Sequence, residues 1–337
     1  MLIKRLTDAV GLPAYEKEIR ELIKAEIEGH VDSVFTDRLG NLIVTKNKGA
    51  KGLHIGLSAH MDEVGMIVKY IEDSGLIRFV TMGIDPRILP SKIVNIGKDK
   101  IKGVIGTKPV HMTKPDERAR ALELDALYID IGAGSKEEAE KFVSPGDCVS
   151  FDSEYVEFGD NKIKAKALDD RIGCAVIIEA LKSDIKTPVT AIFCVQEEVG
   201  IRGSAGAANR VNVDVYLNLE GTVSADMPSH EDHERVTTLG CGPAISLRDT
   251  GSVFLKKYIN QIVEVAEENN ITWQYRRSGA GGTDAANYHT AHGGTPVINV
   301  AVPVRYLHSP VSVCDKGDYE NMKQLVIKYI QKHGEDK

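Results

Sequence analysis

The fold class follows from the stretch Thr190-Ala191-Ile192-Phe193-Cys194-Val195-Gln196-Glu197-Glu198-Val199-Gly200, which joins an apolar run to two adjacent carboxylates. An apolar run of this length is typical of a buried strand. A strand that enters a core should not end in paired acids unless a cation, a partner or a metal ion compensates their charge, because an isolated buried carboxylate is very costly. Glu197 and Glu198 therefore indicate a charged site at the end of a strand.

Three further apolar runs end in side chains that can bind a metal ion. They are residues 53–59, before His60 and Asp62; residues 213–219, before Glu220; and residues 295–303, before His308. In open α/β sheets, ligands lie outside the carboxyl ends of the strands, so we expect these side chains to meet at one edge of a sheet. Their oxygen and nitrogen donors suit zinc, cobalt or manganese.

Helix and strand patterns lie on both sides of a β-rich segment. Residues 2–30 show helical spacing, and after Lys164 predicted helices alternate with predicted strands, which implies a mostly parallel sheet with helices on both faces. Residues 66–164 contain short β-type runs punctuated by Gly and Pro, which is typical of a small barrel. We therefore expect an α/β domain of residues 1–65 and 165–337 with an inserted β-rich domain of residues 66–164.

Composition excludes several classes of protein. The formal net charge of -7 argues against a nucleic-acid partner, because such proteins usually carry basic patches. Five scattered cysteines without a C-x-x-C pair are typical of reduced thiols. No apolar run approaches the roughly 20 residues that span a bilayer, and the first residues lack the apolar stretch of a signal peptide. These observations predict a soluble, cytoplasmic protein that binds neither nucleic acid nor membrane.

His60 and Asp62 are spaced so that they can act together. In an extended segment, residues i and i+2 face the same side, so the Asp62 carboxylate could hydrogen-bond the imidazole of His60 and fix its tautomer. His60 is then a candidate metal ligand and Asp62 its supporting partner. The alternatives are a structural histidine and a loop salt bridge.

A further acidic pair, Asp169-Asp170, opens a predicted helix at residues 170–182. Asp170 is the better N-cap, which leaves Asp169 free to project, and one carboxylate can bridge two metal ions. We therefore expect Asp169 to be such a bridge, with N-capping by Asp169 as the alternative.

Glu197 and Glu198 are expected to have different roles, because adjacent side chains on an extended chain diverge. One is a candidate metal ligand, and the other a general base that takes a proton from metal-bound water. Alternatively, both acids start the next helix and complement its dipole. Similarly, Glu220 could cap a turn and His308 could pack before Pro310, although each follows a strand of buried type.

The run Gly281-Gly282-Thr283-Asp284 lacks the spacing of a phosphate-binding loop. We expect it to open a helix with Thr283 or Asp284 as the cap. The same two residues are the candidates for substrate binding beside the pocket.

Five short motifs resemble those of the metallopeptidase family 42 aminopeptidases, which include glutamyl aminopeptidases and tetrahedral (TET) aminopeptidases. The matching stretches are His60–Gly65, Ala167–Gly173, Gln196–Gly200, Gly282–Ala285 and His308–Pro310. Each motif alone is modest, but five in this order span almost the whole chain and are highly specific. One departure is Glu220, where many relatives carry Asp, and the longer side chain bears on the geometry and metal preference of the site.

The resemblance implies two divalent metal ions per subunit, Zn²⁺, Co²⁺ or Mn²⁺. It makes Asp169 the bridge between them and Glu197 the general base. It places the remaining ligands in two pairs, His60 with Glu220 on one metal and Glu198 with His308 on the other. It also implies that the insertion is PDZ-like and used for assembly into homo-oligomers, often tetrahedral dodecamers.

These expectations together predict an aminopeptidase that removes N-terminal amino acids from peptides, with a metal-bridging hydroxide as the nucleophile. A deacylase of N-acyl amino acids could use the same site. A glycan hydrolase is disfavoured, because the carboxylates are committed to metal rather than to a free acid and nucleophile pair. A non-catalytic peptide-binding or assembly protein is the third alternative. The sequence does not predict the preferred first residue or the native metal.

Overall fold

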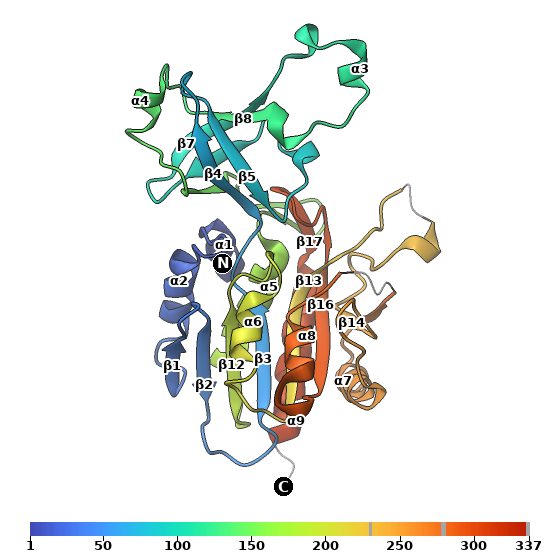
Figure 1. Cartoon of the computed structure of the whole chain (residues 1–337). Helices are drawn as coiled ribbons and strands as arrows, with labels where there is room; N and C mark the ends of the chain where they lie inside the picture. The colour runs from blue at the N-terminus through green and yellow to red at the C-terminus, as the bar shows by residue number, and fades with distance from the viewer. Residues whose placement is uncertain (229–230, 278–280, 335–337) are drawn as a thin grey trace. The chain divides into compact units, whose positions relative to one another are not determined.

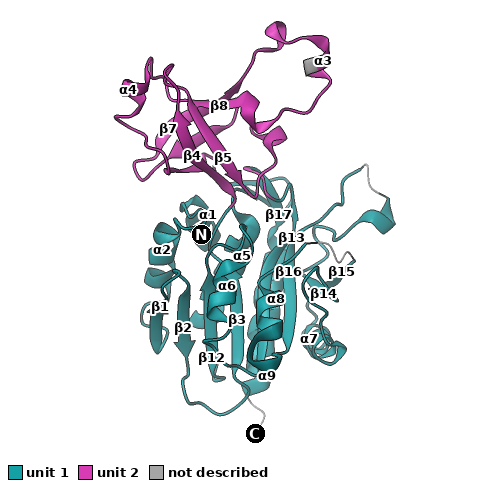
Figure 2. Cartoon of the chain, in the orientation of Figure 1, with its two compact units in different colours: residues 1–63, 155–307, 311–337 teal, residues 64–154, 308–310 magenta. Residues whose placement is uncertain are grey.

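The computed structural model describes residues 1–228, 231–277 and 281–334, apart from the side chain of Glu117. The chain divides into two compact units (Figure 2). Unit 1 comprises residues 1–63, 155–307 and 311–337, and unit 2 comprises residues 64–154 and 308–310.

Unit 1 contains an 11-stranded mixed sheet (Figure 1). Its strands are β1 (Ser33–Thr36), β2 (Leu42–Lys46), β3 (Ile55–His60), β10 (Val156–Phe158), β11 (Lys162–Ala165), β12 (Val189–Cys194), β13 (Val215–Val223), β14 (Ala244–Ser246), β15 (Gln274–Arg276), β16 (Val297–Arg305) and β17 (Ser312–Asp315). The spatial order is β1-β2-β12-β3-β13-β16-β17-β11-β10, with β14 pairing β15 and β16. The central strands β12, β3, β13 and β16 are parallel; β2, β17 and β14 pair with them antiparallel, and β15 pairs with β14 in parallel.

The central strands are buried along their length, as continuous apolar runs of parallel sheets should be. Gly56 in β3 is required by this packing, because a Cβ there would lie 2.3 Å from the ring of Tyr216 on β13. That ring in turn stacks on Tyr288, with centroids 4.2 Å apart. The sheet therefore holds its carboxyl ends on a rigid, closely packed base.

Helices cover the sheet of unit 1 on both faces. They are α1 (Leu2–Asp8), α2 (Lys17–Ile27), α5 (Leu168–Lys182), α6 (Arg202–Ala207), α7 (Lys256–Glu268), α8 (Ala285–Thr290) and α9 (Lys316–Gly334). The helix α5 packs on β3 and β13 and contacts α1, α2 and α9, whereas α6 and α8 pack together against β12 and β16. Nearly every residue of α5 is buried, so its first turn is fixed at the edge of the sheet.

Unit 2 is a closed antiparallel barrel with the strand order β4-β5-β8-β7-β6-β9. Its strands are β4 (Gly65–Ile71), β5 (Ile77–Met82), β6 (Ile93–Ile96), β7 (Ile101–Thr107), β8 (Leu127–Asp130) and β9 (Cys148–Phe151), and its short helices are α3 (Pro115–Arg118) and α4 (Lys136–Ala139). Closure leaves no free sheet edge, and the barrel has an apolar core of its own.

The predicted fold class is confirmed: an α/β sheet with helices on both faces and an inserted β-barrel. Two details differ from the sequence-based expectation. Residues 156–164 fall within the expected bounds of the insertion, but they form β10 and most of β11, which join the large sheet because β11 pairs with β17. The strand β13 continues past the predicted end at residue 219, through Glu220 to Val223. It does so because residues 216–223 of β13 pair with residues 297–304 of β16. No helix in the described part of the chain is long and apolar enough to cross a membrane.

Candidate metal centre

The candidate site lies at the carboxyl ends of β12, β3 and β13. In the parallel pairs, Cys194 lies opposite His60 and Asn218 lies opposite Ser58. Glu220, two residues after Asn218, therefore reaches the level of His60. The register thus brings together side chains that are far apart in the sequence, and the first turn of α5 lies beside them.

His60 is buried at the centre of the site, with 1% of its surface exposed. Its Nδ1 atom lies 3.1 Å from the backbone oxygen of Asp62 and 3.6 Å from Oδ1 of the same residue. Its Nε2 atom faces Asp169 Oδ1 at 3.4 Å and Glu220 Oε2 at 3.6 Å. Burial lowers the pKa of His60, but hydrogen bonds to Asp169 and Asp62 and the surrounding acids raise it well above its ordinary value. A metal ion at Nε2 would take the place of that proton.

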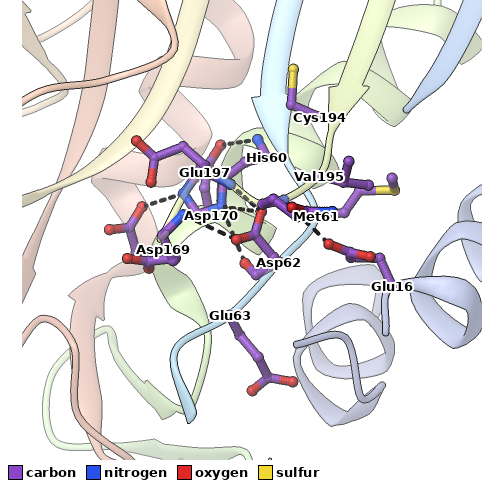
Figure 3. A network of polar contacts seen from close by, with 12 residues as sticks. Glu16, His60, Met61, Asp62, Glu63, Asp169, Asp170, Cys194, Val195 and Glu197 are labelled. Carbon is purple, nitrogen blue, oxygen red and sulfur yellow. Dashed lines mark hydrogen bonds and ion pairs between the residues drawn. The ribbon is translucent and has the colours of Figure 1, made fainter. Parts of the chain in front are cut away.

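Asp62 holds the turn that carries the two adjacent glutamates. Its fully buried carboxylate accepts hydrogen bonds from the backbone N–H of Glu197 at 2.9 Å and of Glu198 at 3.0 Å (Figure 3). Each of its oxygens takes one of these bonds, while Oδ1 also faces His60. Asp62 therefore fixes the histidine and both glutamates relative to one another, which is more than the support of His60 that the sequence predicted.

Asp169 lies between β3 and β13 at the start of α5. Its Oδ1 atom faces His60 and accepts a hydrogen bond from the backbone N–H of Gly221 at 3.2 Å. A Cβ at position 221 would lie 3.0 Å from the Asp169 Cβ. A side chain at the residue after Glu220 would therefore require Asp169 to shift by a few tenths of an ångström.

Asp170 is the fully buried neighbour of Asp169. Its Oδ1 atom accepts from Gly173 N at 2.9 Å, as the expected helix cap does, and its Oδ2 atom accepts from His60 N at 3.2 Å. The second contact was not expected from the sequence. It ties the first turn of α5 to the end of β3.

Among the residues that the structure describes, two overlapping groups of side chains could hold a metal ion. The ligand atoms of His60, Asp169 and Glu198 lie within 4.8 Å of one another, and so do those of His60, Asp170 and Glu220. A histidine with several carboxylates is a donor set that suits zinc, cobalt or manganese. The residues of the site therefore fit divalent metal ions.

The carboxylates of the site also require a cation. Burial, followed by the repulsion of neighbouring acids, raises the pKa of Glu220 well above its ordinary value. Burial does the same for Asp170, and it raises the pKa of Glu197 to about 9 against a partial opposing effect of His60. Acids this close cannot all be charged without a compensating positive charge, and metal ions would supply it.

Three predicted site residues, Thr283, Asp284 and His308, are not members of these two groups. Asp284 is fully buried and accepts a hydrogen bond from the Ser204 hydroxyl, so a substrate cannot reach its carboxylate in this structure. Thr283 is partly exposed, and its hydroxyl donates to Asp249 Oδ2 at 3.1 Å. His308 follows β16 in the segment 308–310, which clusters with unit 2.

Glu16 is a buried acid that the sequence did not single out. Its Oε1 atom accepts from Ala14 N at 2.9 Å and from Gln196 N at 3.2 Å, directly before Glu197. Burial raises its pKa to about 7. It precedes an ordinary amphipathic helix, α2, and its contact with the strand end depends on tertiary packing.

The sequence from residue 40 to residue 325 matches the model of the M42 glutamyl aminopeptidase family. The chain belongs to this family, as its five motifs predicted. Membership makes it an aminopeptidase of the metallopeptidase class and implies a divalent metal.

Solved structures agree with this assignment. An aminopeptidase of the archaeon Desulfurococcus kamchatkensis is 34% identical, with a TM-score of 0.93 over 98% of this chain and 93% of that one. The TET1 peptidase of Pyrococcus horikoshii, which can assemble into a tetrahedron or a large octahedral shell, is 32% identical, with a TM-score of 0.86 over 97% of each chain. A Thermotoga maritima protein described as an endoglucanase is 36% identical, with a TM-score of 0.82 over 99% of this chain and 98% of that one.

Proposed function

We propose that the chain is a di-metal aminopeptidase that removes N-terminal amino acids from peptides. The observation that carries this proposal is the convergence of His60 with Asp169 and Glu198 on one candidate metal position, and with Asp170 and Glu220 on an overlapping one. Glu197, beside them, is held by Asp62 through its backbone N–H at 2.9 Å. Metal ligands with an adjacent acid are the arrangement that metal-assisted hydrolysis requires.

The two metals would share Asp169, with His60 and Glu220 on one and Glu198 and His308 on the other. Asp169 is favoured over Asp170 as the bridge, because both oxygens of Asp170 already accept backbone hydrogen bonds. The assignment of His308 rests on the family motif rather than on a contact in unit 1.

Divalent metals bound here would act as Lewis acids, which lower the pKa of water and polarise a peptide carbonyl. Glu197 takes the proton of the attacking water and returns it to the departing amine. Its raised pKa, about 9 through burial, suits a group that holds a proton between these transfers, and bound cations would lower that pKa toward neutrality. The excess of acids favours a positively charged N-terminal amine, which restricts cleavage to chain ends.

We further propose that the protein assembles into a homo-oligomer through unit 2. Large apolar side chains are exposed on this unit, including Val110 at 67%, Met112 at 62% and Phe142 at 58%. Such side chains can be covered where subunits meet, and the TET1 peptidase of Pyrococcus horikoshii, a relative of this chain, can assemble into a tetrahedron. A mass in solution equal to one chain would contradict this proposal, and a mass equal to twelve chains would support a dodecamer like those of the TET enzymes.

The endoglucanase description of the Thermotoga maritima relative makes glycan hydrolysis the second candidate. Glycosidases usually need two carboxyl groups free to act as acid and as nucleophile or base. In this chain the candidate carboxylates converge on His60 instead. Release of sugar from cellulose by the metal-loaded protein, without peptide cleavage, would favour the second candidate.

Replacing Glu197 by glutamine tests the mechanism. The amide keeps the shape of the side chain but cannot accept the proton, so kcat for peptide hydrolysis should fall roughly 10²–10⁴-fold, with the metal content unchanged. Glu198→Gln is the matched comparison and should reduce the metal content. If Glu197→Gln releases metal while Glu198→Gln retains it, the two roles have been assigned the wrong way round.

A further inference from the structure

Behind Glu220 lies a row of buried polar side chains, which we call the amide ladder: the amides of Asn218 and Asn299 and the hydroxyl of Ser246. The Nδ2 atom of Asn218 donates to Glu220 Oε1 at 3.0 Å and to Asn299 Oδ1 at 2.9 Å. The Nδ2 atom of Asn299 donates to Ser246 Oγ at 3.0 Å. The exposed fractions are 0% for Asn218, 3% for Asn299 and 0% for Ser246, so these bonds do not compete with bulk water.

Strand register produces the ladder. Asn218 lies opposite Asn299 in the parallel pair β13–β16, and continuing the antiparallel pairing of β14 with β16 places Ser246 beside Asn299. Asn218 and Glu220 are two residues apart on β13, so they share a face of the sheet. A single line of polar side chains therefore crosses the core from β14 and ends at the candidate metal ligand.

The carboxylate sets the direction of the ladder. An ionised Glu220 can only accept hydrogen bonds, so Asn218 must present its NH₂ group to Oε1, and Asn299 must then turn its oxygen toward Asn218. Because Oε1 is engaged in this way, Oε2 is the oxygen that faces His60 Nε2 at 3.6 Å. The glutamate thus offers one chosen oxygen to the metal position.

We propose that Asn218, held by Asn299 and Ser246, is a positioning residue that makes Glu220 a one-oxygen metal ligand and sets the affinity of the metal position shared with His60. This inference rests on the proposed function, because it requires a metal at that position. Residues that orient a metal ligand through hydrogen bonds typically contribute 10–100-fold to metal affinity. A ladder with only a structural role would affect stability without affecting metal binding.

The test measures metal binding directly, by titrating the metal-free protein with Zn²⁺ in competition with a chromophoric chelator. Asn218→Leu keeps the approximate volume but removes the donor. It should weaken one of the two bound equivalents roughly 10–100-fold and leave the other within about threefold. Ser246→Ala releases the far end of the ladder and should shift the same equivalent in the same direction by a smaller factor. If Asn218→Leu does not fold, Ser246→Ala alone tests the proposal.

Thr187→Val is the matched control. Its buried hydroxyl donates to Ile330 O at 2.7 Å, before the start of β12 and therefore at the opposite end of that strand from the site. It should lower stability without changing either zinc affinity. If the variants of Asn218 and Ser246 behave like this control, the inference is wrong while the proposed function stands. If the unmodified protein binds none of Zn²⁺, Co²⁺ and Mn²⁺, the proposed function fails, and the inference fails with it.

Discussion

The buried Asp62 carboxylate contacts both His60 and the turn of Glu197 and Glu198, so replacing it by asparagine should disturb the whole site. The carboxylate accepts from the backbone N–H groups of Glu197 and Glu198 at 2.9 and 3.0 Å and lies 3.6 Å from His60 Nδ1. An asparagine can keep one of these bonds, but its NH₂ group then faces the other N–H. Hydrogen bonds to charged groups contribute about 1.5–3 kcal/mol each, so we expect a loss of about 2 kcal/mol in the free energy of unfolding.

The effect on activity should exceed what this loss of stability explains, because the turn with the general base and a ligand is displaced. We expect kcat/KM for a peptide substrate to fall roughly 10–100-fold, as for other residues that orient metal ligands. Asp318→Asn is a matched control, since the buried Asp318 carboxylate accepts from Gly240 N at 2.8 Å and Gly242 N at 2.7 Å. Urea unfolding and steady-state kinetics should show similar losses of stability but little loss of activity for the control. Equal kcat/KM values for the two variants would refute the reasoning.

Three other perturbations test separate parts of the account. In the metal-free protein, burial raises the pKa of Glu197 to about 9, so the folded state holds a proton that the unfolded state releases near pH 4.5. Urea melts in EDTA should therefore show the free energy of unfolding falling from pH 5 to pH 9. A flat profile would contradict this. Gly221→Ala would place a Cβ 3.0 Å from the Asp169 Cβ, and chelator competition should show roughly tenfold weaker metal binding; unchanged affinity would mean that Asp169 is not constrained there. Lys166→Met removes the buried cation that contacts both oxygens of Glu63 at 2.7 Å. In urea unfolding, this variant should lose about 3–5 kcal/mol of the free energy of unfolding. A loss below about 1 kcal/mol would show that the ion pair is not desolvated.

The convergence of the site could be predicted because its cause is local. Apolar runs that end in His60, Glu198 and Glu220 indicate strands whose carboxyl ends carry polar groups, and parallel pairing puts such ends at one edge of a sheet. The structure groups His60 with Glu198 and Asp169, and also with Glu220 and Asp170. The β-rich fold of the insertion could likewise be predicted, because short β-type runs alternate with turn residues there.

Other features could not be predicted because they depend on partners far along the chain. The strand β13 runs past Glu220 only because β16 extends beside it, and β11 belongs to the large sheet only because β17 pairs with it. Asp170 was expected to be only a cap, since nothing local reveals its bond to His60 N. The contact of Glu16 with Gln196 N joins residues 180 positions apart, and no pattern near Glu16 signals it.

Hydrolysis of a matched panel of peptides tests the central claim most directly. Free dipeptides and their N-acetylated counterparts, together with cellulose, would be offered to the metal-free protein before and after reloading with Zn²⁺ or Co²⁺. The account predicts cleavage of free peptides only, dependent on added metal and lowered roughly 10²–10⁴-fold in Glu197→Gln. Cleavage of the acetylated peptides alone would indicate a deacylase, sugar release would indicate a glycan hydrolase, and turnover without metal would contradict the proposed site.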